Sequence, residues 1–273
     1  MWSTVQTHGG REYQEDRFWT HNDGKGIMRA VVCDGHGGFE ASEFVTRYLS
    51  NPRRKWNMET ASSTLSRCVN VWDRKCLRAL GCQTLRSFPQ TEAERKKLFN
   101  AASDECLRIY ERHGYISGST VVMVYLDTKA GIGRVINLGD SRATWKTMKR
   151  GERLHATKDH KPKPNQLWGP IEGKITIDPG DSARINGDLA VGRAFGDNST
   201  DLMGTVPSVP DMYDVKWDPT QEFRMVIATD GLWDDVNNSF SIRHAKDPQR
   251  LEHEARKQGS TDNVTIVSLV LKP

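Results

Sequence analysis

The chain has 273 residues, a length that suits one large hydrophobic core or two small ones. Lys and Arg number 39 against 35 Asp and Glu, so the formal charge is only +4, too weak to indicate a nucleic-acid-binding protein. No apolar run is long enough to cross a membrane and the first residues do not resemble a signal peptide, so we expect neither a membrane partner nor export.

The first part of the chain predicts one strand followed by three helices. Residues 28–33 form an apolar run typical of a strand, and 39–49 carry apolar residues at helical spacing. The same spacing recurs over 65–80, and a capping box at 91–94 opens a third helix that runs toward Gly114. A helical block therefore separates the first strand from the rest of the predicted sheet.

After Gly114 the pattern changes to that of a β-sheet. Apolar runs at 121–126 and 133–138 lie on either side of a turn and predict a hairpin. Further apolar runs at 224–229 and 264–271 predict two more strands. Between them, Asp247-Pro248 opens a helix that should end at Gly259.

The segment from 161 to 186 is rich in Pro, Gly and polar residues, which predicts an irregular excursion. No internal repeat is present, so we expect one domain over residues 1–273, and a monomer. The five cysteines include no C-x-x-C pair, which indicates neither a zinc site nor a disulfide framework. We therefore expect a reducing, intracellular location, either cytoplasmic or nuclear.

Carboxylates gather at the ends of the predicted strands. Strands end just before Asp34, Asp140 and Asp230, whereas Asp262 precedes the first residue of another strand. The start of one antiparallel strand lies beside the end of its neighbour, so Asp262 is expected to meet Asp34 and Asp230 at one sheet edge. With two acidic residues of "REYQED", the expected cluster comprises Glu15, Asp16, Asp34, Asp140, Asp230 and Asp262.

Such a cluster needs compensation, because each added negative charge raises the pKa of the others. Divalent cations supply it, and oxygen-only ligands favour hard ions such as Mg²⁺ or Mn²⁺. Glycine after Asp34 and after Asp230 would let the backbone turn sharply, and the Gly35 carbonyl would be a further ligand. Asp-Gly alone is an ordinary turn dipeptide; the shared position at strand ends is what indicates a metal site.

Eight short motifs then resemble, in order, those of the metal-dependent type 2C protein serine/threonine phosphatases. They are "REYQED" (11–16), "DGHGG" (34–38), "SGST" (117–120), "NLGDSR" (137–142), "DHKP" (159–162), "GDLAVGRAFGD" (187–197), "ATDGLWD" (228–234) and "TDNVT" (261–265). The resemblance implies an α+β, phosphatase 2C-like fold, a sandwich of two antiparallel β-sheets flanked by α-helices in four αββα layers. It also implies that 161–186 is a flap beside the active site.

The resemblance also implies a role for each matched residue. Asp34 would bridge two Mg²⁺ or Mn²⁺ ions, Gly35 would bind one, and Asp230 and Asp262 the other. Glu15 and Asp16 would act largely through metal-bound water, and Asp140 with Asp230 would form a weaker third site.

The expected activity is hydrolysis of phosphoserine and phosphothreonine in phosphoprotein substrates by direct attack of a metal-bridging hydroxide. Arg11 would grip the phosphate and His36 would protonate the departing oxygen.

Some readings stay open at this point. Arg11 also fits a simple ion-pair partner, and His36 a surface histidine. Two rival functions remain. A catalytically silent phosphoprotein-binding or scaffold module would have lost a metal ligand, and a metal-dependent nuclease or phosphodiesterase would have a basic groove. The sequence departs from the family after "DHKP", where flap contacts cannot be carried over, and at Gly192, where serine is common.

Overall fold

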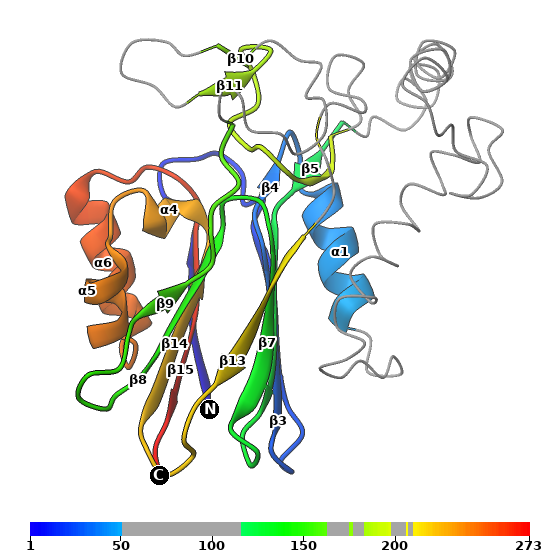
Figure 1. Ribbon diagram of the computed structural model, residues 1–273. Helices are drawn as coiled ribbons and strands as arrows, with labels where there is room; N and C mark the ends of the chain where they lie inside the picture. The colour runs from blue at the N-terminus through cyan, green and yellow to red at the C-terminus, as the bar shows by residue number, and fades with distance from the viewer. Residues whose placement is uncertain (51–115, 163–174, 177–182, 198–205, 207–209) are drawn as a thin grey trace, which may run out of the picture.

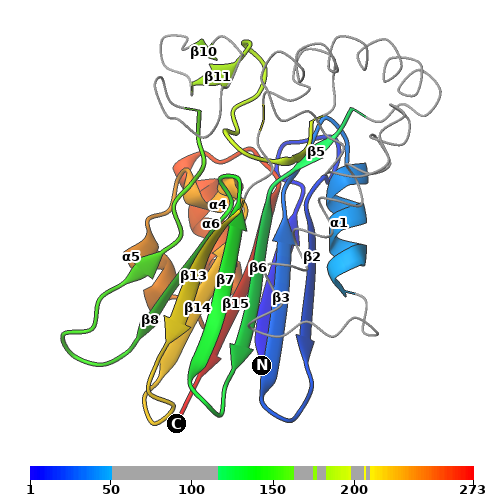
Figure 2. The ribbon, with the colours of Figure 1, turned by 45° about the vertical axis from the view of Figure 1, so that its right-hand side comes forward.

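The computed structural model describes residues 1–50, 116–162, 175–176, 183–197, 206 and 210–273. Two five-stranded antiparallel sheets form the centre of the protein (Figures 1 and 2). The first sheet has the order β1 (Trp2–Thr7), β15 (Val264–Leu271), β14 (Phe223–Ala228), β8 (Arg142–Thr147) and β9 (His155–Ala156). The second has the order β13 (Asp211–Lys216), β7 (Ile132–Leu138), β6 (Val121–Asp127), β3 (Ile27–Cys33) and β2 (Arg17–Asn22).

Helices cover the outer faces of both sheets, as Figure 1 shows. Helix α1 (Glu40–Ser50) packs on β2 and β3 of the second sheet. On the first sheet lie α4 (Asp230–Trp233), α5 (Asn238–Arg243) and α6 (Pro248–Gln258). The four-layer αββα sandwich expected from the sequence is confirmed.

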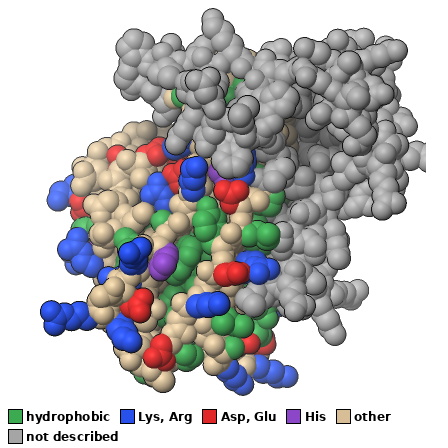
Figure 3. Space-filling view, in the orientation of Figure 1, with side chains coloured by type: hydrophobic (Ala, Val, Ile, Leu, Met, Phe, Trp, Pro, Cys, Tyr) green, Lys and Arg blue, Asp and Glu red, His purple; other side chains and the backbone are tan. Residues whose placement is uncertain are grey.

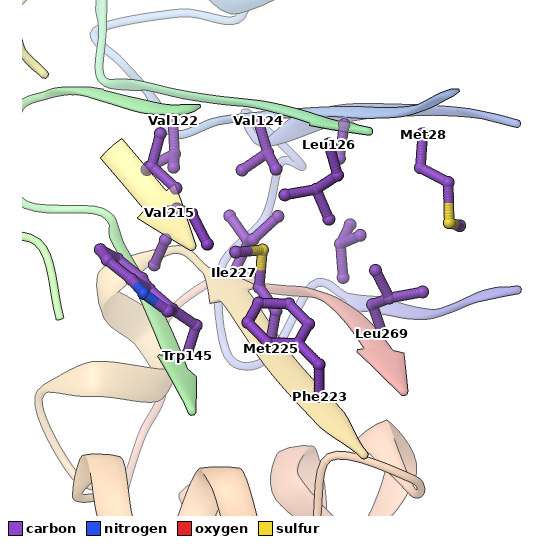
Figure 4. Close-up of a cluster of buried hydrophobic side chains, with 14 of the residues drawn as sticks. Met28, Val122, Val124, Leu126, Trp145, Val215, Phe223, Met225, Ile227 and Leu269 are labelled. Carbon is purple, nitrogen blue, oxygen red and sulfur yellow. The ribbon is translucent and has the colours of Figure 1, made fainter. Parts of the chain in front are cut away.

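The central strands are buried on both faces, as the two sets of side chains on β14 show. In β14, Met225 and Ile227 face the second sheet, whereas Val226 and Ala228 face the helices. Both faces of the strand are therefore buried, which accounts for a continuous apolar run in place of alternation. The cluster between the sheets includes Met28, Val122, Trp145, Phe223 and Leu269 (Figure 4).

Helix α6 ends where its sequence signals place it. The Asp247 side chain accepts a hydrogen bond from the backbone N–H of Arg250, and Pro248 occupies the first turn, where a missing N–H costs nothing. Gly259 closes the helix with a left-handed φ of 111°.

Most predicted elements within the described residues are confirmed, including β3, α1, the β6–β7 hairpin, β14 and β15. The helices predicted over 65–80 and from 91 lie outside the described residues. Within the predicted irregular excursion, β10 (Ile175–Thr176) pairs with β11 (Arg184–Ile185), and the residues between them lie outside the described part, except 183.

Strands β1, β2, β8 and β13 were not predicted. Three of them are outer or partly exposed strands with polar residues among the apolar ones, so periodicity gave a weak signal.

Both chain ends lie at the end of the sandwich opposite β4 (Gly35–His36) and β5 (Gly118–Ser119), as Figures 1 and 2 agree. Positive and negative side chains are interspersed over the described part of the face in Figure 3. None of the helices in the described residues has the length and apolarity needed to span a membrane.

Candidate active site

The strand register brings the predicted carboxylates to one end of the sandwich. Arg17 pairs with Cys33 in the second sheet, and Thr7 pairs with Val264 in the first, so the segments that carry Asp16, Asp34 and Asp262 lie at the same end. The sequence placed Asp262, Asp34 and Asp230 at one sheet edge, and this detail was wrong. Asp34 extends β3 of the second sheet, whereas Asp230 and Asp262 belong to the first, so the acidic residues converge from both sheets.

A pocket of about 470 Å³ opens between these strand ends. Eight of the nine candidate residues line it: Arg11, Glu15, Asp34, Gly35, His36, Asp140, Asp230 and Asp262. Asp16 does not line it. Its side chain is buried behind the pocket, with 1% of the residue exposed, and accepts a hydrogen bond from Thr229 Oγ1 at 3.0 Å.

The glycines next to two of the aspartates are required by space. A Cβ on Gly35 would lie 2.5 Å from the Glu15 carbonyl oxygen, and one on Gly231 would lie 2.1 Å from the Asn263 carbonyl oxygen. Neither glycine has the positive φ of a tight turn. The expected sharp turn is therefore replaced by close packing of separate backbone segments around the acidic residues.

The segment before β2 is tied to the start of β15. Asn263 Oδ1 accepts a hydrogen bond from the backbone N–H of Glu15 at 2.8 Å, and Asn263 Nδ2 donates to the backbone carbonyls of His8 and Tyr13. Arg11 Nη2 donates to Asp262 Oδ2 at 2.8 Å, and the Arg11 side chain is 58% exposed. The ion-pair reading of Arg11 is thus observed, but the partner is itself a predicted metal ligand.

The acidic residues are poorly compensated by the protein around them. Desolvation raises the pKa of Asp34 and of Asp230 well above the ordinary value, and neighbouring carboxylates add to the effect. Desolvation also raises the pKa of Asp16 to about 7. Among the described residues, the buried Asp16 Oδ1 accepts no hydrogen bond, and the buried Asp140 carboxylate has only an ion pair, with Lys161 Nζ 3.3 Å from its Oδ2.

These oxygens fit hard divalent cations, because such ions supply both the missing charge and the missing partners. In the part of the chain that the structure describes, no three His, Cys, Asp or Glu side chains are arranged as ready ligands of one ion.

Lys161 forms ion pairs with two carboxylates of the pocket. Lys161 Nζ lies 3.3 Å from Asp140 Oδ2 and 3.0 Å from Asp234 Oδ1. Burial opposes the charge of Lys161, but Asp140 and Asp234 outweigh it and the pKa is raised. Sequence reasoning assigned no role to Lys161 or Asp234, although both lie in quoted motifs, "DHKP" and "ATDGLWD".

A histidine–aspartate pair forms one side of the pocket. His36 Nε2 lies 2.5 Å from Asp197 Oδ1, and the Asp197 side chain is only 2% exposed. Burial lowers the pKa of His36, but the Asp197 carboxylate outweighs that effect, so the net shift is upward. Asp197 ends the motif "GDLAVGRAFGD", and its link to His36 was missed because 160 residues separate them.

Cys33, at the end of β3, is free and buried. Burial raises its pKa to about 12, which keeps the thiol protonated and unsuited to act as a nucleophile. The other four cysteines lie outside the described residues.

Comparisons with known proteins agree with this arrangement. Residues 21–264 match the family model described as Protein phosphatase 2C. Two Arabidopsis thaliana relatives, Probable protein phosphatase 2C 69 and Probable protein phosphatase 2C 71, are each 31% identical over 95% of this chain. The chain spans 66% of the first relative and 53% of the second, so it corresponds to about half to two thirds of their length.

A solved structure shows the same fold. The serine-threonine phosphatase 2C from Toxoplasma gondii superposes with a TM-score of 0.66 at 22% identity, covering 99% of this chain and 94% of that one.

Proposed function

The chain belongs to the protein phosphatase 2C family, and we propose that it is a metal-dependent protein serine/threonine phosphatase. The substrates proposed are phosphoserine and phosphothreonine in proteins, hydrolysed without a covalent enzyme intermediate. The observation that carries the proposal is the convergence of acidic residues from two sheets on one pocket, where burial and neighbouring carboxylates raise the pKa of Asp34 and Asp230.

We assign the metal ligands as the family resemblance implies, and all of them except Asp16 line the pocket. Asp34 and the Gly35 carbonyl would hold one Mg²⁺ or Mn²⁺ ion, and Asp34, Asp230 and Asp262 a second. Glu15 and Asp16 would bind through water, and Asp140 with Asp230 would form a weaker third site. When bound, the ions supply charge neutralisation and an activated water for in-line attack on phosphorus.

Arg11 binds the phosphate in this proposal. Its guanidinium has five N–H donors, one of which is directed at Asp262, and its exposed side chain can turn toward a ligand in the pocket. A bidentate contact to phosphoryl oxygens orients the substrate and stabilises charge that develops in the transition state.

His36 supplies a proton to the departing serine or threonine oxygen. Its side chain lines the pocket beside Gly35 and is 26% exposed. Proton donation to an alkoxide leaving group contributes typically about 10²- to 10⁴-fold to the rate. The rival reading as a silent binding module predicts a lost metal ligand, and every acidic position named above is filled.

The test is turnover of a phosphoserine and phosphothreonine peptide panel after chelation and dialysis, with and without added Mg²⁺ or Mn²⁺. We expect activity only with the ion, and loss of it in Asp230→Asn. Asp214→Asn is the matched control, because Asp214 is 63% exposed and pairs with Arg134 away from the pocket. Full activity without metal, or an unchanged rate in Asp230→Asn, would refute the proposal.

A further inference from the structure

The pair formed by His36 and Asp197 is built by the three-stranded sheet β12-β5-β4, in which β12 comprises Phe195–Gly196. Strand β5 lies in the middle, with Gly118 opposite both His36 and Gly196. His36 and the residue after Gly196 are thus held on the two sides of one glycine. The chain brings residues 36 and 197 together through backbone pairing, independently of the side-chain contact itself.

Gly118 leaves the space in which the two side chains meet. A Cβ at this position would lie 2.2 Å from His36 Nε2 and 2.3 Å from Asp197 Oδ1, closer than atoms can approach. No side chain other than hydrogen therefore fits between the strands while the contact exists. This steric requirement explains why the motif "SGST" has glycine at position 118, which the sequence alone did not explain.

Asp197 is held in place at a conformational cost. It adopts a φ of 56°, in the left-handed region that residues other than Gly, Asn and Asp rarely occupy, and its side chain is almost fully buried. Its Oδ1 contacts His36, whereas its Oδ2 has no hydrogen-bond partner. A strained, buried carboxylate directed at a pocket histidine is a costly arrangement for scaffold alone.

The contact decides which ring nitrogen of His36 can serve the reaction. With Nε2 held by Asp197, only Nδ1 can donate to a substrate without breaking the pair. Among the described residues, Nδ1 has no hydrogen-bond partner.

We propose that Asp197 is a positioning residue that holds His36 in one ring orientation, with Nδ1 left to protonate the leaving oxygen. This inference rests on the proposed phosphatase function. In the step concerned, the oxygen of water bonds to phosphorus and gives up one proton to solvent. The bond between phosphorus and the serine oxygen breaks, and that oxygen takes the Nδ1 proton. Solvent then returns a proton to the ring. Asp197 exchanges no proton with the substrate.

The main test compares two substrates with different leaving groups. A phosphothreonine peptide releases a poor leaving group that needs protonation, whereas 4-nitrophenyl phosphate releases a good one that does not. We expect Asp197→Asn to lower kcat for the peptide by about 10²-fold and for the aryl ester by less than about 3-fold, with KM nearly unchanged. Equal losses on the two substrates would overturn the proposal.

A second comparison asks whether Asp197 acts through His36. We expect the double variant His36→Gln/Asp197→Asn to be no slower on the peptide than His36→Gln, because the two residues act as one unit. Losses that multiply would show separate roles and overturn the inference. Gly118→Ala gives a steric version of the test, and should change the ratio of the two substrate rates in the same direction as Asp197→Asn.

Nitrogen NMR of His36 in the metal-free protein tests the contact without using activity. In the wild type we expect Nε2 to keep its proton directed at Asp197 in both the neutral and the acid form of the ring, with Nδ1 protonated as well in the acid form that donates to the substrate. We expect the His36 signals to change in Asp197→Asn. The same spectrum in both proteins would overturn the proposal even if the enzyme is active. Conversely, a wild type that hydrolyses neither substrate with metal refutes the phosphatase proposal, while the spectra still report on the pair.

Discussion

Two histidine–aspartate pairs in this protein differ in how completely they are satisfied. His160 Nε2 contacts Asp211 Oδ2 at 3.2 Å, its Nδ1 accepts the Gly139 backbone N–H at 3.0 Å, and Asp211 also accepts from Arg193. In the pocket, Asp197 is the partner of His36 Nε2, and among the described residues Asp197 Oδ2 has no hydrogen-bond partner. The same two residue types thus form a closed structural contact in one place and an open one in the other.

The two environments also shift the histidines in opposite directions. Burial, followed by the positive charge of Arg193, lowers the pKa of His160, whereas Asp197 outweighs burial and raises the pKa of His36. A ring that accepts a backbone N–H must be neutral and is fixed as scaffold. The comparison indicates that the number of satisfied hydrogen bonds, more than the residue types, distinguishes a structural His–Asp pair from one available for catalysis in this fold.

The largest expected effect comes from removing the charge of a carboxylate in the pocket that contains the His36–Asp197 pair. Asp230→Asn should lower metal-dependent turnover by at least about 10³-fold, since a cation that stabilises the transition state loses a ligand. The metal-free protein should be no less stable, because the raised pKa of Asp230 shows that its charge is unfavourable in the folded state. Phosphopeptide kinetics and thermal unfolding in chelator measure the two effects. A large loss of metal-free stability would contradict the view that this carboxylate is uncompensated.

The next effect is a pH dependence of stability without metal. The folded pKa of Asp16 is about 7, above that of the unfolded chain, so its favourable contribution is complete below the unfolded pKa and lost as pH rises through about 7. Urea unfolding in chelator should therefore show the free energy of unfolding falling between about pH 5 and about pH 8. Asp16→Asn should flatten this dependence, and added Mg²⁺ should reduce it. Stability that rises over this interval in the metal-free wild type would count against the assignment.

A moderate effect is expected where the protein supplies its own cation. Lys161→Met leaves Asp140, which is 1% exposed, without the ammonium 3.3 Å away. For the protein without metal, we expect the free energy of unfolding measured with urea to fall by about 1–3 kcal/mol. Added Mn²⁺ should restore more of it than in the wild type. Lys146→Met is the control, because Lys146 lies on β8 and does not line the pocket. Equal losses in the two variants would show that Lys161 provides no special compensation.

The smallest effect on catalysis should come from a change in the His160–Asp211 pair. Asp211→Asn removes the partner of His160 and should lower stability by about 1–2 kcal/mol. The ratio of peptide to aryl phosphate rates should stay within about 2-fold of the wild type, because His160 is no proton donor. The same two substrates used for Asp197→Asn provide the measurement. A changed ratio would remove the distinction between the two pairs.

Much of the fold could be predicted because the central strands are buried on both faces. The runs that became β3, β14 and β15 are continuous and apolar, whereas β1 and β13 alternate exposed and half-buried residues and give a weaker signal. The family resemblance, confirmed by the comparisons, then supplied the two-sheet arrangement that periodicity does not contain.

The site was predicted in membership but only partly in geometry. Strand ends located Asp34, Asp140, Asp230 and Asp262 at one end, because antiparallel strands alternate in direction. Local pattern cannot say which sheet each strand joins, so the convergence from both sheets was missed. The contact between residues 36 and 197 was also missed, because it depends on Gly118 in a third strand.

The position of the two chain ends has a practical consequence. Both lie at the far end of the sandwich from the short strands that carry Gly35 and Gly118 (Figures 1 and 2). A fluorescent reporter or a surface linker fused to either end would point away from the end of the sandwich at which the proposed phosphoprotein substrate would bind. Immobilised turnover assays can therefore use both orientations interchangeably, and a rate that depends on which end is anchored would reveal contacts beyond the catalytic cavity.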